Sequence, residues 1–221
     1  MNEPSVHEVY ECWAPQYPAV PHNPLMQTEQ AAMLERLPAI QGSCVLDLAC
    51  GSGRYATQAR LRGAARIVAM DFSLAMLRQV SVGAALRGEL DALPLRDAQF
   101  DLVISGLALG HASDLTGCMR EIARVLKPGG TLLYSDFHPE AQRRGQTRSF
   151  RDARGERHTV PPAPFDRTAH LNAIRAAALE IIEVFEPRAG VEFLPEFPQA
   201  SSFFQDWRGT PTLLIVRARK P

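Results

Sequence analysis

The sequence is poor in cysteine and has no motif of closely spaced cysteines. Cys12, Cys44, Cys50 and Cys118 are scattered over 221 residues, and no pair has the C-x-x-C spacing. Widely separated thiols of this kind are typical of free, buried cysteines, whereas zinc clusters and disulfide frameworks need regular spacing. We therefore expect neither disulfides nor a bound metal.

Long apolar runs are also missing, as is an excess of charge of either sign. No stretch reaches the roughly 18 to 20 apolar residues that span a bilayer, and residues 1–4 lack the basic start of an export signal. Lys and Arg total 24 against 24 Asp and Glu, which gives no general attraction to nucleic acid. These absences favour a cytoplasmic protein without a membrane or nucleic-acid partner, and the length suits a single domain over residues 1–221.

The most informative feature present is an apolar stretch that leads into a glycine turn at residues 45–55. Gly51 and Gly53 have no Cβ, so the backbone can bend sharply and a ligand can lie against it. A helix that begins near Arg54 would point its positive end at that ligand, which favours a carboxylate or a phosphate. The turn therefore predicts a site for a nucleotide-type cofactor.

Two cofactors fit this turn. Residues 51–56 match the dinucleotide pattern G-x-G-x-x-A, and Asp71 follows Gly51 by twenty residues, at the end of a second apolar strand. One carboxylate there can accept hydrogen bonds from both hydroxyls of an adenosine ribose. NAD and S-adenosylmethionine (SAM) both carry such a ribose.

Further motifs follow in a fixed order, at residues 71–77, 88–95, 100–105 and 120–130. Together with Asp47 and the turn, they closely resemble the class I SAM-dependent methyltransferases, in particular the small-molecule branch that includes quinone-biosynthesis and malonyl-carrier-protein methyltransferases. The resemblance is good over residues 5–137 and holds only in outline beyond them. It implies SAM as cofactor and S-adenosylhomocysteine as product. The cofactor-binding residues that it implies are Asp47, Ala49, Cys50, Gly51, Gly53, Asp71, Phe72, Ser73, Met76, Glu89, Leu90, Asp91 and Ser105. Family members usually have Asp-Ala at the Glu89-Leu90 position, so either Glu89 or Asp91 is expected to contact the adenine amino group.

Strand-like and helix-like patterns alternate along the chain, which predicts an α/β fold with a mostly parallel sheet. Helices are expected from Arg54, over 114–126 with Asp114 as N-cap, and over 167–178. The resemblance implies a Rossmann-like sheet of seven strands with helices on both faces, in which the last strand is antiparallel and lies between its neighbours. The strands are predicted at 43–49, 66–71, 84–88, 100–106, 131–136, 179–186 and 211–218.

Segments outside the sheet are expected to close the pocket: an N-terminal helical cap over 1–40 and substrate-side loops over 138–166 and 188–210. Tyr10, Trp13 and Tyr17 have near-helical spacing, which suits either a substrate-binding lid or an amphipathic helix packed at the sheet edge. Six arginines lie between His138 and His158, and of these Arg148 and Arg151 are candidates for binding an anionic substrate. A solvated loop with ordinary surface charges is the competing interpretation.

In-line methyl transfer mainly requires that the acceptor is held in position and that water is excluded. His111 and His138 follow predicted strands and are the candidates for a general base, with His111 preferred. The predicted function is transfer of the SAM methyl group to an O, or an N or C, atom of a small anionic metabolite by a monomer or homodimer. An NAD(P)-dependent oxidoreductase and a SAM-binding protein that does not methylate are the alternatives.

Overall fold

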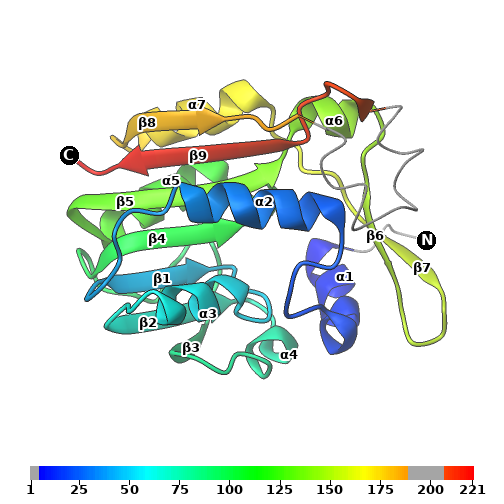
Figure 1. Cartoon of the computed structure of the whole chain (residues 1–221), viewed down its shortest axis with the longest axis horizontal. Helices are drawn as coiled ribbons and strands as arrows, with labels where there is room; N and C mark the ends of the chain where they lie inside the picture. Colours follow the sequence, from blue (N-terminus) through cyan, green and yellow to red (C-terminus); the bar gives the residue numbers. More distant parts are fainter. Residues whose placement is uncertain (1–4, 189–206) are drawn as a thin grey trace.

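A seven-stranded mixed sheet forms the centre of the computed structural model, which describes residues 5–188 and 207–221 (Figure 1). The strand order is β3-β2-β1-β4-β5-β9-β8. Every pair from β3 to β5 is parallel, whereas β9 is antiparallel to both of its neighbours, β5 and β8. The predicted Rossmann-like sheet with an inserted antiparallel last strand is therefore confirmed. The strands are β1 (Cys44–Leu48), β2 (Arg66–Asp71), β3 (Ala84–Arg87), β4 (Phe100–Gly106), β5 (Leu126–Phe137), β8 (Glu180–Phe185) and β9 (Leu213–Arg219).

Helices cover both faces of the sheet, as predicted. Helices α2 (Pro24–Glu35) and α3 (Arg54–Leu61) lie on the front face in Figure 1, and α5 (Leu115–Val125) and α7 (Arg167–Ala176) lie behind it. Strand β1 shows why two cores form. Successive side chains of a strand point to opposite faces of the sheet. Leu46 and Leu48 therefore pack into the core beneath α5 and α7, whereas Val45 packs into the core beneath α2 and α3. Short helical segments also follow three of the strands: α4 (Leu74–Leu77) after β2, the 3-10 turn η2 (Leu109–His111) after β4 and α6 (Pro139–Arg143) after β5.

The boundary between α5 and β5 differs slightly from the prediction. Asp114 is the N-cap of α5 and accepts a hydrogen bond from the Thr116 N–H, as expected. The helix ends at Val125, however, and β5 begins directly at Leu126, ahead of the predicted strand at 131–136, so it includes the Pro-Gly-Gly sequence of residues 128–130. Lys127 is thus a strand residue, and its ammonium pairs with Asp101 across the sheet at 2.8 Å.

Beyond the carboxyl ends of the parallel strands lie α1 (Val6–Trp13), the 3-10 turn η1 (Ala14–Gln16) and a two-stranded hairpin of β6 (Arg148–Arg151) and β7 (Arg157–Val160) (Figure 1). Trp13 of α1 stacks on Phe150 of the hairpin, with ring centroids 4.6 Å apart. Segment 138–166 is therefore not simply a loop, because it contains α6 and this hairpin. The expected cap over 1–40 is also divided, since α2 buries Met26 and Met33 against the sheet.

Most of the predicted loop 188–210 lies outside the described residues. Within the parts of the chain that are described, no helix is both long and apolar enough to cross a bilayer.

Candidate functional site

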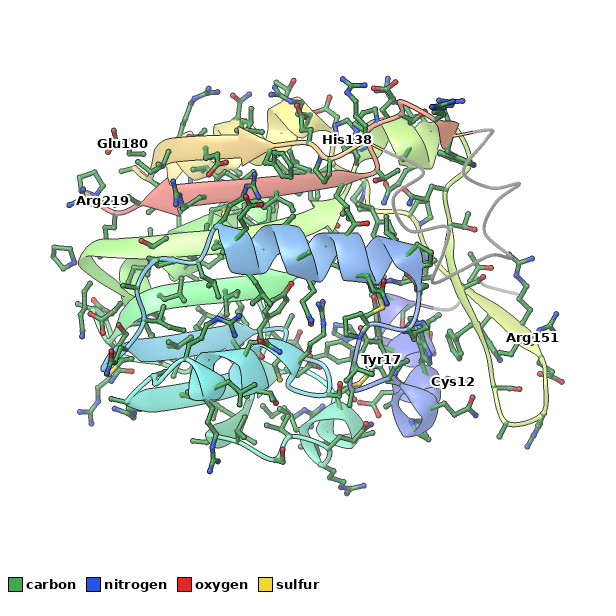
Figure 2. The ribbon with its side chains drawn as sticks, viewed as in Figure 1. Cys12, Tyr17, His138, Arg151, Glu180 and Arg219 are labelled. Carbon is green, nitrogen blue, oxygen red and sulfur yellow. The ribbon has the colours of Figure 1, made fainter. Side chains whose placement is uncertain are left out.

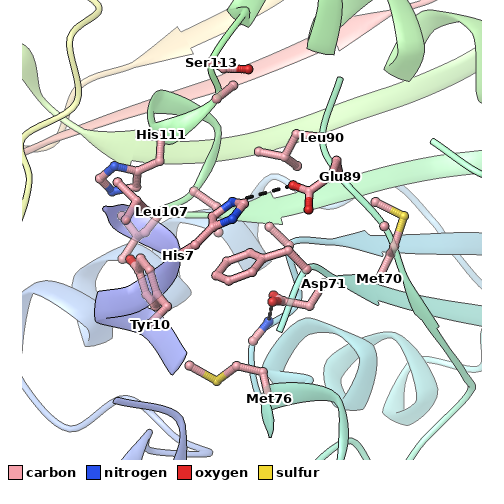
Figure 3. A pocket seen from close by; sticks show the side chains of 18 of the residues that line it. His7, Tyr10, Met70, Asp71, Met76, Glu89, Leu90, Leu107, His111 and Ser113 are labelled. Carbon is pink, nitrogen blue, oxygen red and sulfur yellow. Dashed lines mark hydrogen bonds and ion pairs between the residues drawn. The ribbon is translucent and has the colours of Figure 1, made fainter. Parts of the chain in front are cut away.

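A pocket opens at the carboxyl ends of β1, β2 and β4, where open α/β sheets place their ligands (Figure 3). Loops after the strands form its floor, and α1 with Arg148 of the hairpin closes it from above. The lining residues include Val6, His7, Tyr10, Tyr17, Ala49, Gly51, Met70, Asp71, Phe72, Met76, Glu89, Leu90, Asp91, Gly106, Leu107, Ala108, His111, Ser113 and Arg148.

The floor consists of two turns with unusual backbone conformations. After β1, Ala49 and Gly51 have φ values of 51° and 54°, and Gly53 has 85°. After β4, Leu107 has a φ of 59°. Gly106 precedes it, and a Cβ there would lie 2.5 Å from the Tyr55 ring, so a side chain cannot be accommodated at this position without displacing that ring. The two turns leave a smooth concave floor on which a ligand can lie close to the backbone.

Asp71, at the end of β2, is anchored by backbone N–H groups. Its Oδ2 accepts a hydrogen bond from Gly51 at 2.8 Å, and its Oδ1 accepts one from Ser73 at 2.9 Å. Burial raises the pKa of this carboxyl, and the two N–H groups oppose that rise. Each carboxylate oxygen keeps a second lone pair, so Asp71 can still accept hydrogen bonds from hydroxyls in the pocket.

Asp47 lies beneath the first turn and is almost fully buried. Its Oδ2 accepts a hydrogen bond from the Ala56 N–H at 2.7 Å, but its Oδ1 has no partner within the described structure. Burial raises the pKa of Asp47 to about 8, although Ala56 and Arg54 oppose the shift. An unpaired buried carboxyl oxygen is costly. Asp47 is not among the residues that line the pocket, so this oxygen lies behind the turn and not on the pocket surface.

The side chains predicted to contact adenine come together around Phe72. Met76, Glu89 and Leu90 line the same part of the pocket. His7 of α1 stacks on Phe72 with ring centroids 4.1 Å apart, and its Nε2 lies 3.6 Å from Glu89 Oε2 (Figure 3). Asp91 also lines the pocket.

The opposite part of the pocket is cationic. The Arg148 guanidinium donates to the Tyr10 hydroxyl and to the Leu107 carbonyl, the latter at 3.3 Å. It also packs 4.8 Å from the centre of the Phe137 ring. Among the described residues, Arg148 forms no ion pair with a carboxylate. His111 lies beside Tyr10, with ring centroids 6.2 Å apart.

Titration behaviour in this region follows from burial. Burial lowers the pKa of His111, with the Asp136 carboxylate opposing the shift and the Arg148 charge adding to it. Burial also raises the pKa of Tyr10 to about 12, so its hydroxyl stays protonated at neutral pH. The pocket therefore presents a neutral imidazole next to a phenol and a guanidinium.

Several predicted site residues do not reach the pocket. His138 is the N-cap of α6, where its Nδ1 accepts from the Glu140 N–H and its Nε2 lies 3.1 Å from Glu186. The imidazole is thus held by structural partners, which removes the basis for His138 as a general base. Arg151 is exposed on the hairpin and donates to the Gly155 carbonyl at 2.8 Å.

The other displaced candidates support the pocket from behind. Ser73 is the N-cap of α4, Gly53 is the left-handed N-cap of α3, and Cys50 is buried. Ser105 is buried within β4, and Trp13 lies behind Tyr10 and Tyr17 in a small aromatic cluster. None of the five is among the residues that line the pocket, so any effect they have on a ligand is indirect.

Two residues of the site were missed by sequence reasoning. His7 had no visible signal, because its role depends on where α1 packs. Glu29 of α2 is fully buried, accepts from Tyr55 and Ser135 at 2.7 and 2.5 Å, and pairs with Arg54 at 2.7 Å. Glu29 lies at helical spacing from the buried Met26 and Met33, and a carboxylate at such a position was the signal that could have revealed this network behind the floor.

The comparisons with known proteins agree with this geometry. Residues 46–134 match the methyltransferase domain model of the Methyltransf_11 family. A malonyl-[acyl-carrier protein] O-methyltransferase 1 from Coxiella burnetii is 42% identical over 134 residues, which cover 58% of this chain and 45% of that protein. The match thus spans less than half the length of that curated relative.

Solved structures extend the likeness to nearly the whole chain. An S-adenosylmethionine-dependent methyltransferase from Mesorhizobium loti is 25% identical, with a TM-score of 0.71, over 87% of this chain and 97% of that one. The [4+2]-cyclase SpnF, at 19% identity, has a TM-score of 0.70 over 100% of this chain and 98% of that one. The fold and the turn at the end of β1 define a Rossmann-like protein of the methyltransferase type. The chain is similar to the class I SAM-dependent methyltransferases in its fold and, over residues 46–134, in its sequence.

Proposed function

We propose that this protein transfers the methyl group of SAM to an oxygen atom of a small anionic metabolite, with a nitrogen or carbon acceptor less favoured, and releases S-adenosylhomocysteine. The observation that carries the proposal is one pocket with two chemically different ends. One end has the acidic and apolar groups that suit an adenosine and an amino acid ammonium, and the other has a guanidinium without a carboxylate partner among the described residues.

The residues at the first end fit SAM. The Asp47 carboxyl lies directly beneath the turn after β1, so its charge can attract the methionine ammonium of a ligand that rests on that turn. Asp71 can receive the ribose hydroxyls, while Phe72 and Met76 supply apolar surface for adenine. We assign the adenine amino group to Glu89, because Asp91 Oδ2 already accepts a hydrogen bond from Ser113 Oγ at 2.9 Å.

The second end supports an anionic acceptor. No carboxylate among the described residues forms an ion pair with Arg148, although the Asp136 charge acts on it from further away, so a bound carboxylate or phosphate would give it a direct anionic partner. The Tyr10 hydroxyl accepts from Arg148 and keeps its own proton, so it can donate to the same anion. Two donors therefore converge on one side of the pocket.

Bound SAM would supply an electrophilic methyl group on a sulfonium. The chain's own contribution is to bind the acceptor through Arg148 and Tyr10, to exclude water with α1 and the hairpin, and to hold a neutral imidazole at His111. Because burial lowers the pKa of His111, its free nitrogen can accept a proton from a hydroxyl acceptor at neutral pH. A carboxylate acceptor needs no such base.

Two alternatives remain. The glycine turn also matches a nicotinamide dinucleotide pattern, so an oxidoreductase is a competing activity. The second alternative is a SAM-binding protein that does not methylate. The likeness in fold to SpnF favours it, because that protein is named for a [4+2] cyclisation and not for methyl transfer. Whether the protein is a monomer or a homodimer stays a prediction.

The test begins with calorimetric titration of the protein with S-adenosylhomocysteine, NADH and NADPH under the same conditions. We expect saturable binding of S-adenosylhomocysteine alone. A panel of carboxylic acids and phosphates, each paired with its neutral amide or ester, is then scored for SAM-dependent S-adenosylhomocysteine formation. Nicotinamide binding would support the oxidoreductase, and cofactor binding without turnover on any acceptor would support the protein that does not methylate.

The matched variants are Arg148→Gln and Arg151→Gln, which remove neighbouring charges on the same strand. We expect Arg148→Gln to lower kcat/KM for the anionic acceptor at least about tenfold, with S-adenosylhomocysteine binding unchanged. Arg151→Gln should have little effect, because Arg151 points to solvent. Equal activity of both variants would refute the anionic acceptor.

A further inference from the structure

A second cluster of reactive side chains lies outside the pocket, where α1 meets the hairpin. Cys12 of α1, Asp152 of the hairpin turn and His158 of β7 each offer one donor atom, and these three atoms all lie within 4.8 Å of one another. Cys12 is exposed, and Asp152 and His158 are partly covered. Figure 2 labels Cys12 on α1 and Arg151, next to Asp152, on the adjoining hairpin. None of the three lines the pocket.

The carboxylate and the imidazole are held in place before any ligand binds. Asp152 Oδ1 accepts from the N–H groups of Arg154 and Glu156, both at 2.9 Å, so its Oδ2 is aimed at His158 Nε2, also at 2.9 Å. The His158 ring stacks on Phe150, which stacks in turn on Trp13 next to Cys12. Asp152, His158 and the helix α1 that carries Cys12 therefore pack together as one unit.

The nearby arginines do not occupy the cluster. Arg151 donates to the Gly155 carbonyl at 2.8 Å, and Arg157 donates to Ser149 Oγ at 3.3 Å. Neither of these two guanidinium groups therefore lies fixed between the three donor atoms, although the positive charges around the cluster will weaken binding of any cation.

We propose that Cys12, Asp152 and His158 form a binding site for a divalent transition metal of the zinc class. Thiolate, imidazole and carboxylate are the three donors that such ions combine, and three protein ligands leave a fourth position for water. The two fixed donors lie at a separation that one ion can bridge, and rotation of the exposed Cys12 side chain brings in the sulfur. Binding releases the thiol proton to solvent, and His158 binds through Nε2 with its remaining proton on Nδ1.

A metal at this position would connect α1 to the hairpin. These two elements carry Tyr10 and Arg148, whose side chains meet at the cationic end of the pocket. The ion would therefore hold that end closed without touching the acceptor. The metal site does not depend on the proposed methyl transfer, because its ligands lie outside the pocket.

The experiment uses the full chain, without an affinity tag that binds metal and after treatment with a chelator. Zn²⁺ is titrated in competition with a chromogenic chelator, and Co²⁺ is added separately to look for a thiolate-to-cobalt charge-transfer band. The variants are Cys12→Ser and His158→Ala. Cys44→Ser is the matched control, since Cys44 is a partly buried thiol in β1. Circular dichroism of each variant checks that it is folded.

We expect one Zn²⁺ per chain, a Co²⁺ band that Cys12→Ser abolishes, and a metal-dependent rise in Tm that both variants lose. Loss of a direct ligand should weaken Zn²⁺ binding beyond the roughly 10- to 100-fold effect of an outer-shell residue. The control should bind as the unmodified protein does. Zn²⁺ binding that is absent, or equally strong in Cys12→Ser, or a Co²⁺ complex without the band, would overturn the proposal.

Discussion

His7 stacks on Phe72, with ring centroids 4.1 Å apart and planes 12° from parallel. The same imidazole lies 3.6 Å from Glu89. Both partners are residues that we assign to the adenine base. A side chain of α1 therefore lies on surfaces that we assign to the cofactor, so His7 competes with the adenine for them unless its side chain rotates away.

His7→Ala should strengthen binding of S-adenosylhomocysteine. The imidazole stacks on Phe72, and a ligand that uses the same ring must displace it. Without the imidazole the ligand no longer has to break that stacking contact, which is worth about 0.5 to 1.5 kcal/mol, or roughly 2- to 10-fold in Kd. Calorimetry measures this, with His22→Ala as a control because His22 does not line the adenine region. Weaker binding in His7→Ala would mean instead that His7 stacks on the bound adenine.

Asp71→Ala should weaken S-adenosylhomocysteine binding by about 2 to 4 kcal/mol, since two hydrogen bonds from ribose hydroxyls to a charged group are lost. Asp97→Ala is a control for loss of an acidic residue, because Asp97 pairs with Arg124 and does not line the pocket. Unchanged affinity in Asp71→Ala would contradict the placement of the ribose at the end of β2.

Glu89→Gln and Asp91→Asn separate the two candidates for the adenine amino group. Glu89 faces the pocket next to His7, whereas Asp91 is engaged by Ser113. We therefore expect weaker S-adenosylhomocysteine binding in Glu89→Gln and nearly normal binding in Asp91→Asn. The reverse order would reassign the contact to Asp91.

Binding of S-adenosylhomocysteine near neutral pH should release a proton from Asp47. Its pKa of about 8 in the free protein means that the carboxyl is mostly protonated at pH 7, and a nearby ligand ammonium would lower that pKa. Calorimetric titrations in buffers of different ionisation enthalpy measure the number of protons released for each S-adenosylhomocysteine bound. We expect release at pH 7, less release above pH 9, and none in Asp47→Asn. Proton uptake at pH 7 would contradict the assignment.

Arg148→Met should leave the free energy of unfolding unchanged or raise it, because a partly buried cation without a carboxylate partner among the described residues is replaced by an apolar side chain of similar length. Arg54→Met is the comparison, since Arg54 pairs with the buried Glu29, and loss of one partner of a buried pair costs about 3 to 5 kcal/mol. Urea unfolding measures both. Equal losses would show that Arg148 is chiefly a structural residue.

Local chemistry explains why much of the fold could be predicted from the sequence. The alternation of apolar strands with amphipathic helices, the Asp114 cap and the glycines after β1 act over a few residues, so their consequences can be derived without knowledge of distant contacts. The same reasoning placed Asp71 at the end of a strand. It misplaced the start of β5, because pairing with β4 extends that strand through the Pro-Gly-Gly sequence.

Contacts between distant segments were decided only by the tertiary structure. Tyr10 and Arg148 are 138 residues apart, yet they meet at one end of the pocket. His111 and His138 both follow predicted strands, with His111 preferred, and the fold directs His138 toward Glu186. Cysteine spacing predicted no metal site, whereas the packing of α1 on the hairpin places Cys12 beside His158.

The sequence by itself thus determined the order of the seven sheet strands along the chain and the cofactor-side turn, because turn chemistry and apolar periodicity are local. The tertiary structure decided which polar side chains face one another. That outcome depends on how the buried faces of α1, the hairpin and the sheet edge pack together, and no short segment contains this information.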